Sequence, residues 1–234
     1  MPEQIPSSVL GLYDGIFYCY DAANTFLTFG LDRVWRRAAA RRALASSPAR
    51  VLDVCCGTGA LTAELQRLSR GSAIIAALDF SEAMLSRARL RPRSPEITFV
   101  NGDAARLPFP DSSFDALTIS FATRNLAANG GDLKNYFSEF RRVLRPGGVF
   151  VHLETSRPAN RFIRLLFRAY TGAMTAAVKF AAPGGSASYS FLSASIAAFH
   201  APEELSGLLL SAGFLKVSVR PLMFGAAAIH TAEN

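Results

Sequence analysis

The sequence predicts an α/β fold built on a doubly wound, mostly parallel sheet of seven strands. Short apolar segments alternate with helix-like patterns between residues 50 and 154, as is typical of βαβ units. The first apolar segment runs into a glycine turn, Cys55-Cys56-Gly57-Thr58-Gly59, and the second ends on Asp79. A glycine turn followed about 20 residues later by an acidic residue predicts a ligand site at the carboxyl ends of parallel strands.

Each element of this fold has its own local signal. Strands are expected at 50–55, 73–79, 97–101, 114–120 and 148–154, and helices at 60–69, 82–90, 132–144 and 202–212. The run Arg145-Pro-Gly-Gly148 is expected to end the third helix and to start the fifth strand, because proline and glycine stop helices. Two further segments, Leu215 to Arg220 and Met223 to His230, are interpreted as an antiparallel hairpin at the sheet edge.

Helical regions flank this core on both sides in the sequence. Apolar residues recur at helical spacing over residues 12–45, with an interruption near Gly30. Residues 158–199 break the alternation, and their first part, 158–182, carries a second apolar stripe. The arginines beside that stripe are Arg161, Arg164 and Arg168. Such a helix suits a membrane interface, a lid or a dimer contact, and these alternatives stay open. We expect a single domain divided into an N-terminal helical cap (1–47), a cofactor-binding core (48–156), a substrate lid (157–200) and a C-terminal helix with the hairpin (201–234).

Composition and charge narrow the classes of partner. The chain has 234 residues, of which 50% are hydrophobic, and a net charge of +7. A basic protein can bind nucleic acid or anionic lipid headgroups, but no aromatic-interleaved motif accompanies the arginines. We therefore expect a membrane surface as partner and no nucleic acid, while ordinary solvated helix faces remain the alternative explanation of the charge.

The same composition bears on cellular setting and metal binding. No apolar run reaches the roughly 18 residues needed to cross a bilayer, and the first residues lack the pattern of a secretory signal. Three cysteines, two of them adjacent, favour a reducing compartment. We expect a cytoplasmic protein that associates peripherally with membrane. Three histidines and three cysteines without ligand spacing predict that there is no metal site.

The glycine turn and Asp79 together predict a cofactor that contains a nucleoside. Gly57 and Gly59 allow the backbone to approach a ligand closely, and the Asp79 carboxylate can accept hydrogen bonds from a ribose diol. Both an NAD-like dinucleotide and S-adenosylmethionine have such a diol. The turn has no third glycine for a pyrophosphate, so S-adenosylmethionine fits better. Asp53, in the first strand, is expected to bind the methionine amine indirectly or to organise the turn.

Further motifs extend over nearly the whole chain. They are Tyr20-Asp21, Asn24, Phe29-Gly-Leu31, Arg33, Trp35, Leu107-Pro-Phe-Pro-Asp111-Ser-Ser-Phe114-Asp115, Ile119-Ser-Phe-Ala-Thr-Arg124-Asn125, and the segments 53–58, 78–85 and 153–158. In these motifs the chain resembles the ubiquinone/menaquinone biosynthesis C-methyltransferase family, and it is most similar to the demethylmenaquinone branch. The resemblance implies a class I, Rossmann-like fold, S-adenosyl-L-methionine as cofactor and a polyprenyl quinol as substrate.

The resemblance also implies which residues bind the cofactor. They are Thr58, Asp79, Asp103, Ala104 and Ser120, beside the glycines of the turn. A quinol ring carbon is nucleophilic when a neighbouring hydroxyl is ionised, and a nearby cation favours that ionised form. Arg124, with Asn125 beside it, is the expected cation, and a loop-anchoring ion pair is the alternative. Tyr20 and Asp21 are expected to close the site, and His152 is expected in the core.

The function expected from this resemblance is methylation of demethylmenaquinol to menaquinol. The alternatives are the 2-polyprenyl-6-methoxy-1,4-benzoquinol substrate of ubiquinone biosynthesis, and a non-catalytic cofactor-binding subunit of a quinone-assembly complex. A homodimer is left open. Two positions depart from the family pattern, because Ala60 stands where an aspartate commonly follows Gly-Thr-Gly and Ala194 stands where a glutamate is common.

Overall fold

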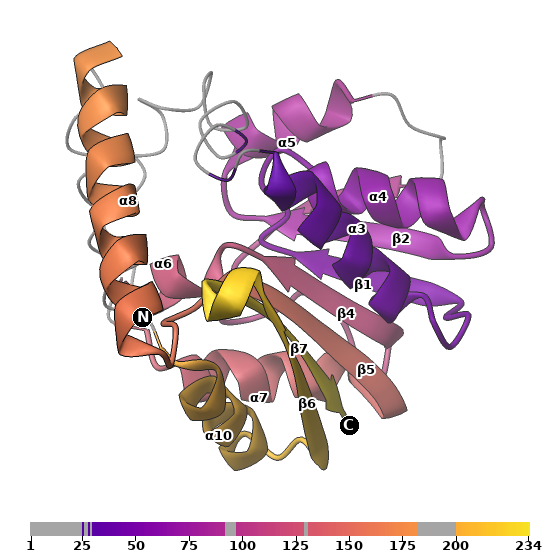
Figure 1. Cartoon of the computed structure of the whole chain (residues 1–234). Helices are drawn as coiled ribbons and strands as arrows, with labels where there is room; N and C mark the ends of the chain where they lie inside the picture. The colour runs from indigo at the N-terminus through magenta and orange to yellow at the C-terminus, as the bar shows by residue number, and fades with distance from the viewer. Residues whose placement is uncertain (1–24, 26–27, 29, 92–96, 129–130, 182–199) are drawn as a thin grey trace.

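The computed structural model describes residues 25, 28, 30–91, 97–128, 131–181 and 200–234 (Figure 1). Its centre is a seven-stranded sheet with the order β3-β2-β1-β4-β5-β7-β6. The strands are β1 (Arg50–Val54), β2 (Ile74–Asp79), β3 (Ile97–Asn101), β4 (Phe114–Ser120), β5 (Leu144–Thr155), β6 (Lys216–Leu222) and β7 (Ala227–Glu233). Strands β1 to β5 are parallel, and β7 pairs antiparallel with both β5 and β6. The predicted fold class and the edge hairpin are confirmed.

Helices cover both faces of the sheet, as Figure 1 shows. They are α3 (Leu31–Ala43), α4 (Ala60–Ser69), α5 (Glu82–Arg89), α6 (Thr123–Ala128), α7 (Leu133–Val143), α8 (Arg161–Ala181) and α10 (Pro202–Ser211). Alternate residues of β1 show how the layers form. Val51 packs in one buried cluster with α3 and α4, whereas Leu52 and Val54 pack in the other cluster with α7 and α10. The first residue of β1, Arg50, is exposed. Because both faces of the rest of the strand are covered, its remaining residues are buried, and all of them except Asp53 are apolar.

Local capping sets the start of two helices that the sequence predicts. The Ser81 hydroxyl accepts a hydrogen bond from the backbone N–H of Met84 at 3.3 Å, and it caps α5. The Asp132 carboxylate accepts one from the Lys134 N–H at 2.9 Å, and it caps α7. The predicted strands and helices of residues 50–143 agree with the structure to within one residue at each end.

The structure differs from the sequence prediction around β5 and α6. Strand β5 begins at Leu144 rather than at residue 148, because Leu144 already pairs with Phe114 before the register shifts to Val149 opposite Ala116. The Pro-Gly-Gly run therefore forms a bulge inside the strand, with Gly147 at a φ of 77°. Helix α6, which directly follows β4, was not predicted because its six residues are too short for a periodic signal.

The terminal regions complete the described fold. Helix α3 begins after Gly30, which has a φ of 76°, so the predicted interruption is confirmed. Residues 12–24 of the predicted helical segment lie outside the described residues. At the other end, a 3-10 turn, η2 (Met223–Gly225), joins β6 to β7. Both hairpin strands therefore begin and end later in the chain than predicted. Met223, the predicted first residue of the second strand, belongs to the turn.

Helix α8 confirms that the apolar stripe is helical. Figure 1 shows it (orange) at one side of the molecule, beside the sheet rather than on it. Phe162, Leu165 and Leu166 remain more than half exposed. An apolar groove lies between α8 and η2, and it is lined by Phe162, Ile163, Leu166, Phe167, Tyr170, Met223, Phe224 and Ala226. None of the helices in the described ranges is long and apolar enough to cross a membrane.

Candidate active site

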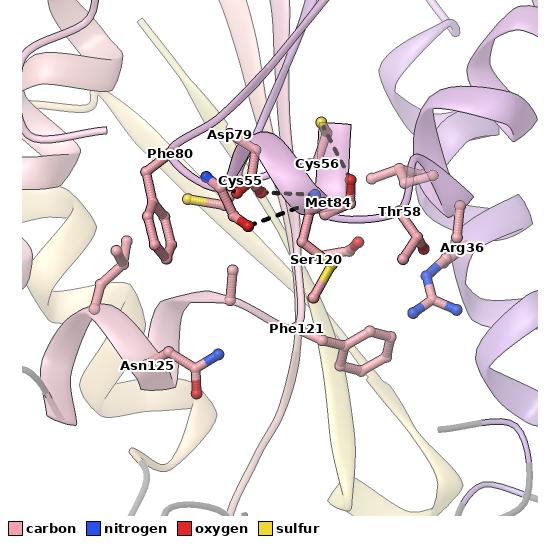
Figure 2. A pocket seen from close by; sticks show the side chains of 16 residues that line it. Arg36, Cys55, Cys56, Thr58, Asp79, Phe80, Met84, Ser120, Phe121 and Asn125 are labelled. Carbon is pink, nitrogen blue, oxygen red and sulfur yellow. Dashed lines mark hydrogen bonds between the residues drawn. The ribbon is translucent and has the colours of Figure 1, made fainter. Parts of the chain in front are cut away.

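A cleft opens at the carboxyl ends of β1, β2 and β4 (Figure 2). The connections from β1 and β4 leave in opposite directions along the sheet, and such a switch point is where ligands bind in doubly wound folds. The lining residues are Arg36, Cys55, Cys56, Gly57, Thr58, Ala60, Leu61, Asp79, Phe80, Ser81, Met84, Ser120, Phe121, Ala122, Asn125 and Leu126. The glycine turn, Asp79, Ser120 and Asn125 therefore meet in one cleft, as the sequence predicts.

The glycine turn brings its backbone to the edge of this cleft. A Cβ on Gly59 would lie 3.0 Å from the Cβ of Ala88, so the close packing of the turn on α5 requires glycine there. A Cβ on Gly57 would meet nothing within 4 Å, which leaves room beside the turn for a ligand. Arg91 holds the turn, because its Nε donates to the Thr58 carbonyl at 2.5 Å and its Nη2 to the Thr58 hydroxyl at 3.2 Å.

Asp79 ends β2 with its carboxylate at the floor of the cleft. One oxygen accepts the Gly57 N–H at 2.7 Å and the other accepts the Ser81 N–H at 3.0 Å. Burial raises the pKa of Asp79, and these backbone donors oppose the rise. Each carboxylate oxygen has a second acceptor site, so the two can accept a pair of hydroxyl donors while they keep the backbone bonds. The two backbone donors thus fix the orientation of the carboxylate at the edge of the cleft.

Asp53 lies under the turn rather than in the cleft. Its oxygens accept the Thr62 hydroxyl at 2.5 Å and the Thr118 hydroxyl at 2.8 Å, and only 1% of the residue is exposed. Burial raises its pKa to about 6, against the hydrogen bonds from the two threonines. These bonds tie β1 to α4 and β4, so the placement agrees with the expectation that Asp53 organises the turn.

Asp103 and Ala104 lie next to the cleft without lining it. Asn101 pairs with Asp79 in the sheet, and Asp103 follows two residues later at the same edge. The exposed Asp103 carboxylate accepts the Ala105 N–H at 2.9 Å, and Ala104 packs in the core with Leu107. Their role as cofactor contacts stays a prediction.

Arg124 is buried against a carboxylate instead of facing the cleft. Its Nη1 lies 2.6 Å from Glu154 Oε1, and the two side chains are 3% and 2% exposed. Glu154 also accepts the backbone N–H and the hydroxyl of Thr155. The arrangement matches the ion-pair alternative and gives no support to direct contact of Arg124 with a substrate. Asn125, the next residue, does line the cleft, and Tyr20 and Asp21 lie outside the described residues.

Arg36 and Phe121 are among the lining residues that the sequence does not predict. Arg36 and Phe121 face each other across one end of the cleft, with the Arg36 Cζ 5.1 Å from the centre of the Phe121 ring. The ring centre of Trp35 lies 6.4 Å from that of Phe121. Asp32 and Arg36 are spaced i, i+4 on α3 and form a buried ion pair. This i, i+4 spacing is the signal in the sequence that indicates the pair.

The remaining reactive side chains of the region are neutral or structural. Burial raises the pKa of the Cys55 and Cys56 thiols well above their ordinary value. His152, expected in the core, is fully buried, and burial lowers its pKa well below the usual value. Its Nε2 lies 2.8 Å from the Thr123 hydroxyl. Across the described ranges, no group of three or more His, Cys, Asp or Glu could hold a metal ion.

Known structures share this fold. A possible histamine N-methyltransferase from Thermotoga maritima, described as S-adenosylmethionine-dependent, superposes with a TM-score of 0.62 at 18% identity, over 95% of this chain and 98% of that one. Human N-acetylserotonin methyltransferase, solved with S-adenosylmethionine, gives a TM-score of 0.58 at 18% identity, over 92% of this chain and 57% of that one. At this identity the similarity establishes the fold alone.

Sequence relatives are much more similar. A demethylmenaquinone methyltransferase of Thermus thermophilus is 39% identical over 92% of this chain and 96% of its own length. A protein of the same name from Deinococcus radiodurans is 40% identical over 92% of this chain and 88% of its own. The ubiquinone/menaquinone biosynthesis C-methyltransferase UbiE of Geobacter sulfurreducens is 36% identical over 92% and 84%. Residues 3–234 also match the sequence profile of the ubiE/COQ5 methyltransferase family. The chain belongs to the ubiE/COQ5 methyltransferase family.

Proposed function

We propose that this protein is an S-adenosylmethionine-dependent C-methyltransferase that converts demethylmenaquinol to menaquinol. The observation that carries the proposal is the 39% identity, over nearly the full length of both chains, to a demethylmenaquinone methyltransferase. The cleft supports the cofactor class, because a buried carboxylate and an open glycine turn meet at the switch point of the sheet. S-adenosylmethionine supplies an electrophilic methyl group, and the protein supplies position and exclusion of water.

The residues of the cleft suit a cofactor that lies across it. Asp79 accepts the two ribose hydroxyls, and Thr58 with the glycine turn lies along the methionine portion. Asp103 and Ala104 contact the adenine from the end of β3, and Ser120 marks the place where the methionine and the acceptor meet. Support for this arrangement comes from the Asp79 carboxylate, whose two oxygens are already oriented by Gly57 and Ser81.

The acceptor side involves α6 and the N-terminal segment. Asn125 faces the cleft from α6. The proposal also gives Tyr20 and Asp21, which lie outside the described residues, the role of closing the site. Arg124 is a positioning residue in this proposal. Its backbone N–H and its guanidinium both donate to Glu154, at 3.4 and 2.6 Å, and they fix α6 against the end of β5. S-adenosylmethionine would supply the methyl group to the ring carbon as its carbon–sulfur bond breaks, and the ring proton would leave to water.

Quinones extracted from cells that lack this protein distinguish the candidate functions. We expect demethylmenaquinone to accumulate and menaquinone to disappear, with recovery when the gene is restored. A benzoquinol intermediate that accumulates instead would indicate the ubiquinone pathway. To separate an enzyme from a non-catalytic subunit, the restored copy should also carry Asp79→Ala. Full recovery of menaquinone by that variant would contradict a catalytic role.

We further propose that the protein docks on membrane through α8. The supporting surface combines exposed Phe162, Leu165 and Leu166 with the η2 turn, where Phe224 is 82% exposed. Phe224 has a φ of 55°, a conformation that is costly for an aromatic residue. Apolar side chains beside arginines are typical of an interfacial helix.

Flotation with anionic vesicles tests this docking. Replacing Arg161, Arg164 and Arg168 with glutamine should weaken binding by about 1 kcal/mol per residue, because each arginine is attracted to anionic headgroups. The control replaces the exposed Arg41, Arg67 and Arg70 of the α3–α4 region, which removes the same charge and should leave flotation unchanged. Equal flotation of all three proteins would indicate that α8 is a lid or a homodimer contact.

A further inference from the structure

Arg36 occupies the end of the cleft that lies opposite Asp79. Figure 2 shows Asp79 and Phe80 on one side, Arg36 and Thr58 on the other, and Ser120 between them. Arg36 comes from α3, so it reaches the cleft from an element outside the sheet core. A ligand that runs from Asp79 along the glycine turn therefore ends beside this guanidinium.

The Arg36 side chain is buried, oriented and incompletely bonded. Only 8% of it is exposed, and its Nη1 forms an ion pair with Asp32. Asp32 is itself held by the Thr28 hydroxyl, which donates to its Oδ1 at 3.1 Å. The Phe121 ring packs against the guanidinium, yet Nε has no hydrogen-bond partner in the described part of the chain. Because a buried donor without a partner is costly, the site favours a ligand that supplies an acceptor.

The charge at this end of the cleft specifies the kind of acceptor. Helix α4 starts at Ala60, which lines the same cleft as Arg36, and its N-terminus adds partial positive charge. Ala60 brings no carboxylate of its own to compete for the arginine. S-adenosylmethionine carries one anionic group, the methionine carboxylate, and this group lies at the opposite end of the molecule from the adenine. An arginine matches a carboxylate in both charge and planar donor geometry.

We propose that Arg36 binds the methionine carboxylate of S-adenosylmethionine. The inference rests on the proposed function only in that Asp79 takes the ribose, which sets the direction of the cofactor. Asp32 orients the guanidinium, and Phe121 shields it from water on one side. Helix α3 thereby couples cofactor binding to the N-terminal part of the fold.

Calorimetry with two ligands tests this proposal. Decarboxylated S-adenosylmethionine keeps the adenosine, sulfonium and amine and lacks only the carboxylate. The unaltered protein should bind S-adenosylmethionine roughly 10- to 100-fold more tightly than the decarboxylated form, as expected for a charge-assisted contact. Arg36→Met alone would leave the buried Asp32 carboxylate without its cation. The test variant is therefore the double substitution Asp32→Asn with Arg36→Met, and its thermal unfolding confirms that it is folded.

The double variant should bind both ligands with nearly equal affinity. The matched control is Asp79→Asn, which should weaken both ligands by the same factor and keep their ratio, because both contain the ribose. If the folded double variant keeps the preference of the unaltered protein, the proposal is overturned. If it keeps both affinities and loses only turnover, Arg36 serves the quinol oxygen instead. Failure to methylate a quinol would leave the ligand ratio unaffected, so the two outcomes are distinguishable.

Discussion

Arg124→Met is expected to lower the free energy of unfolding by about 3–5 kcal/mol, because the substitution leaves Glu154 buried and without its cation. The pair joins α6 to the end of β5 at 2.6 Å, and both side chains are almost fully buried. Denaturation by urea, followed by circular dichroism, measures the change. Adding Glu154→Gln to the variant should recover part of the loss, since an uncharged amide can still accept the Thr155 hydrogen bonds.

An exposed ion pair provides the matched control for this experiment. Arg157 and Glu204 approach to 2.5 Å, but their side chains are 39% and 48% exposed. Arg157→Met should therefore cost no more than about 1 kcal/mol. If Arg124→Met is as stable as this control but loses turnover, Arg124 acts on the substrate directly, and its assignment as a positioning residue is wrong.

The sequence predicts well those parts of the site whose residues lie close together in the chain. A buried strand, a glycine turn and the acidic end of the next strand lie within 30 residues, from Arg50 to Asp79, and they form one edge of the cleft. Their positions follow from strand parallelism and turn chemistry, which are local properties. The further motifs indicate a family, and the comparisons with known proteins confirm it.

The parts that the sequence does not predict depend on pairing between distant elements. Ser120 is opposite Leu153 in the β4–β5 register, so the segment that follows β4 begins beside the last residues of β5. This register brings Arg124 against Glu154, and no spacing in the sequence indicates it. Arg36 reaches the cleft because Trp35 packs near Phe121, which links a motif of α3 to the end of β4. Tertiary packing thus brings motifs that are far apart in the sequence close together in the structure.

In the proposed reaction the methyl group goes to a ring carbon of a reduced quinone. Purified protein would be given methyl-labelled S-adenosylmethionine with a demethylmenaquinone, in either its reduced or its oxidised form, in anionic vesicles. The reduced ring is electron-rich beside its hydroxyl groups, and the oxidised ring is electron-poor. Turnover with the quinol should therefore exceed turnover with the quinone by at least about 100-fold, a difference of roughly 2.7 kcal/mol in the barrier.

The position of the label in the product is the most direct measurement of the central claim. Nuclear magnetic resonance of the isolated product should place the methyl group on the ring carbon, with S-adenosylhomocysteine released in equal amount. Label on a hydroxyl oxygen would identify an O-methyltransferase. Equal reaction of the oxidised quinone, or no transfer by folded protein that binds S-adenosylmethionine, would also contradict the proposed function.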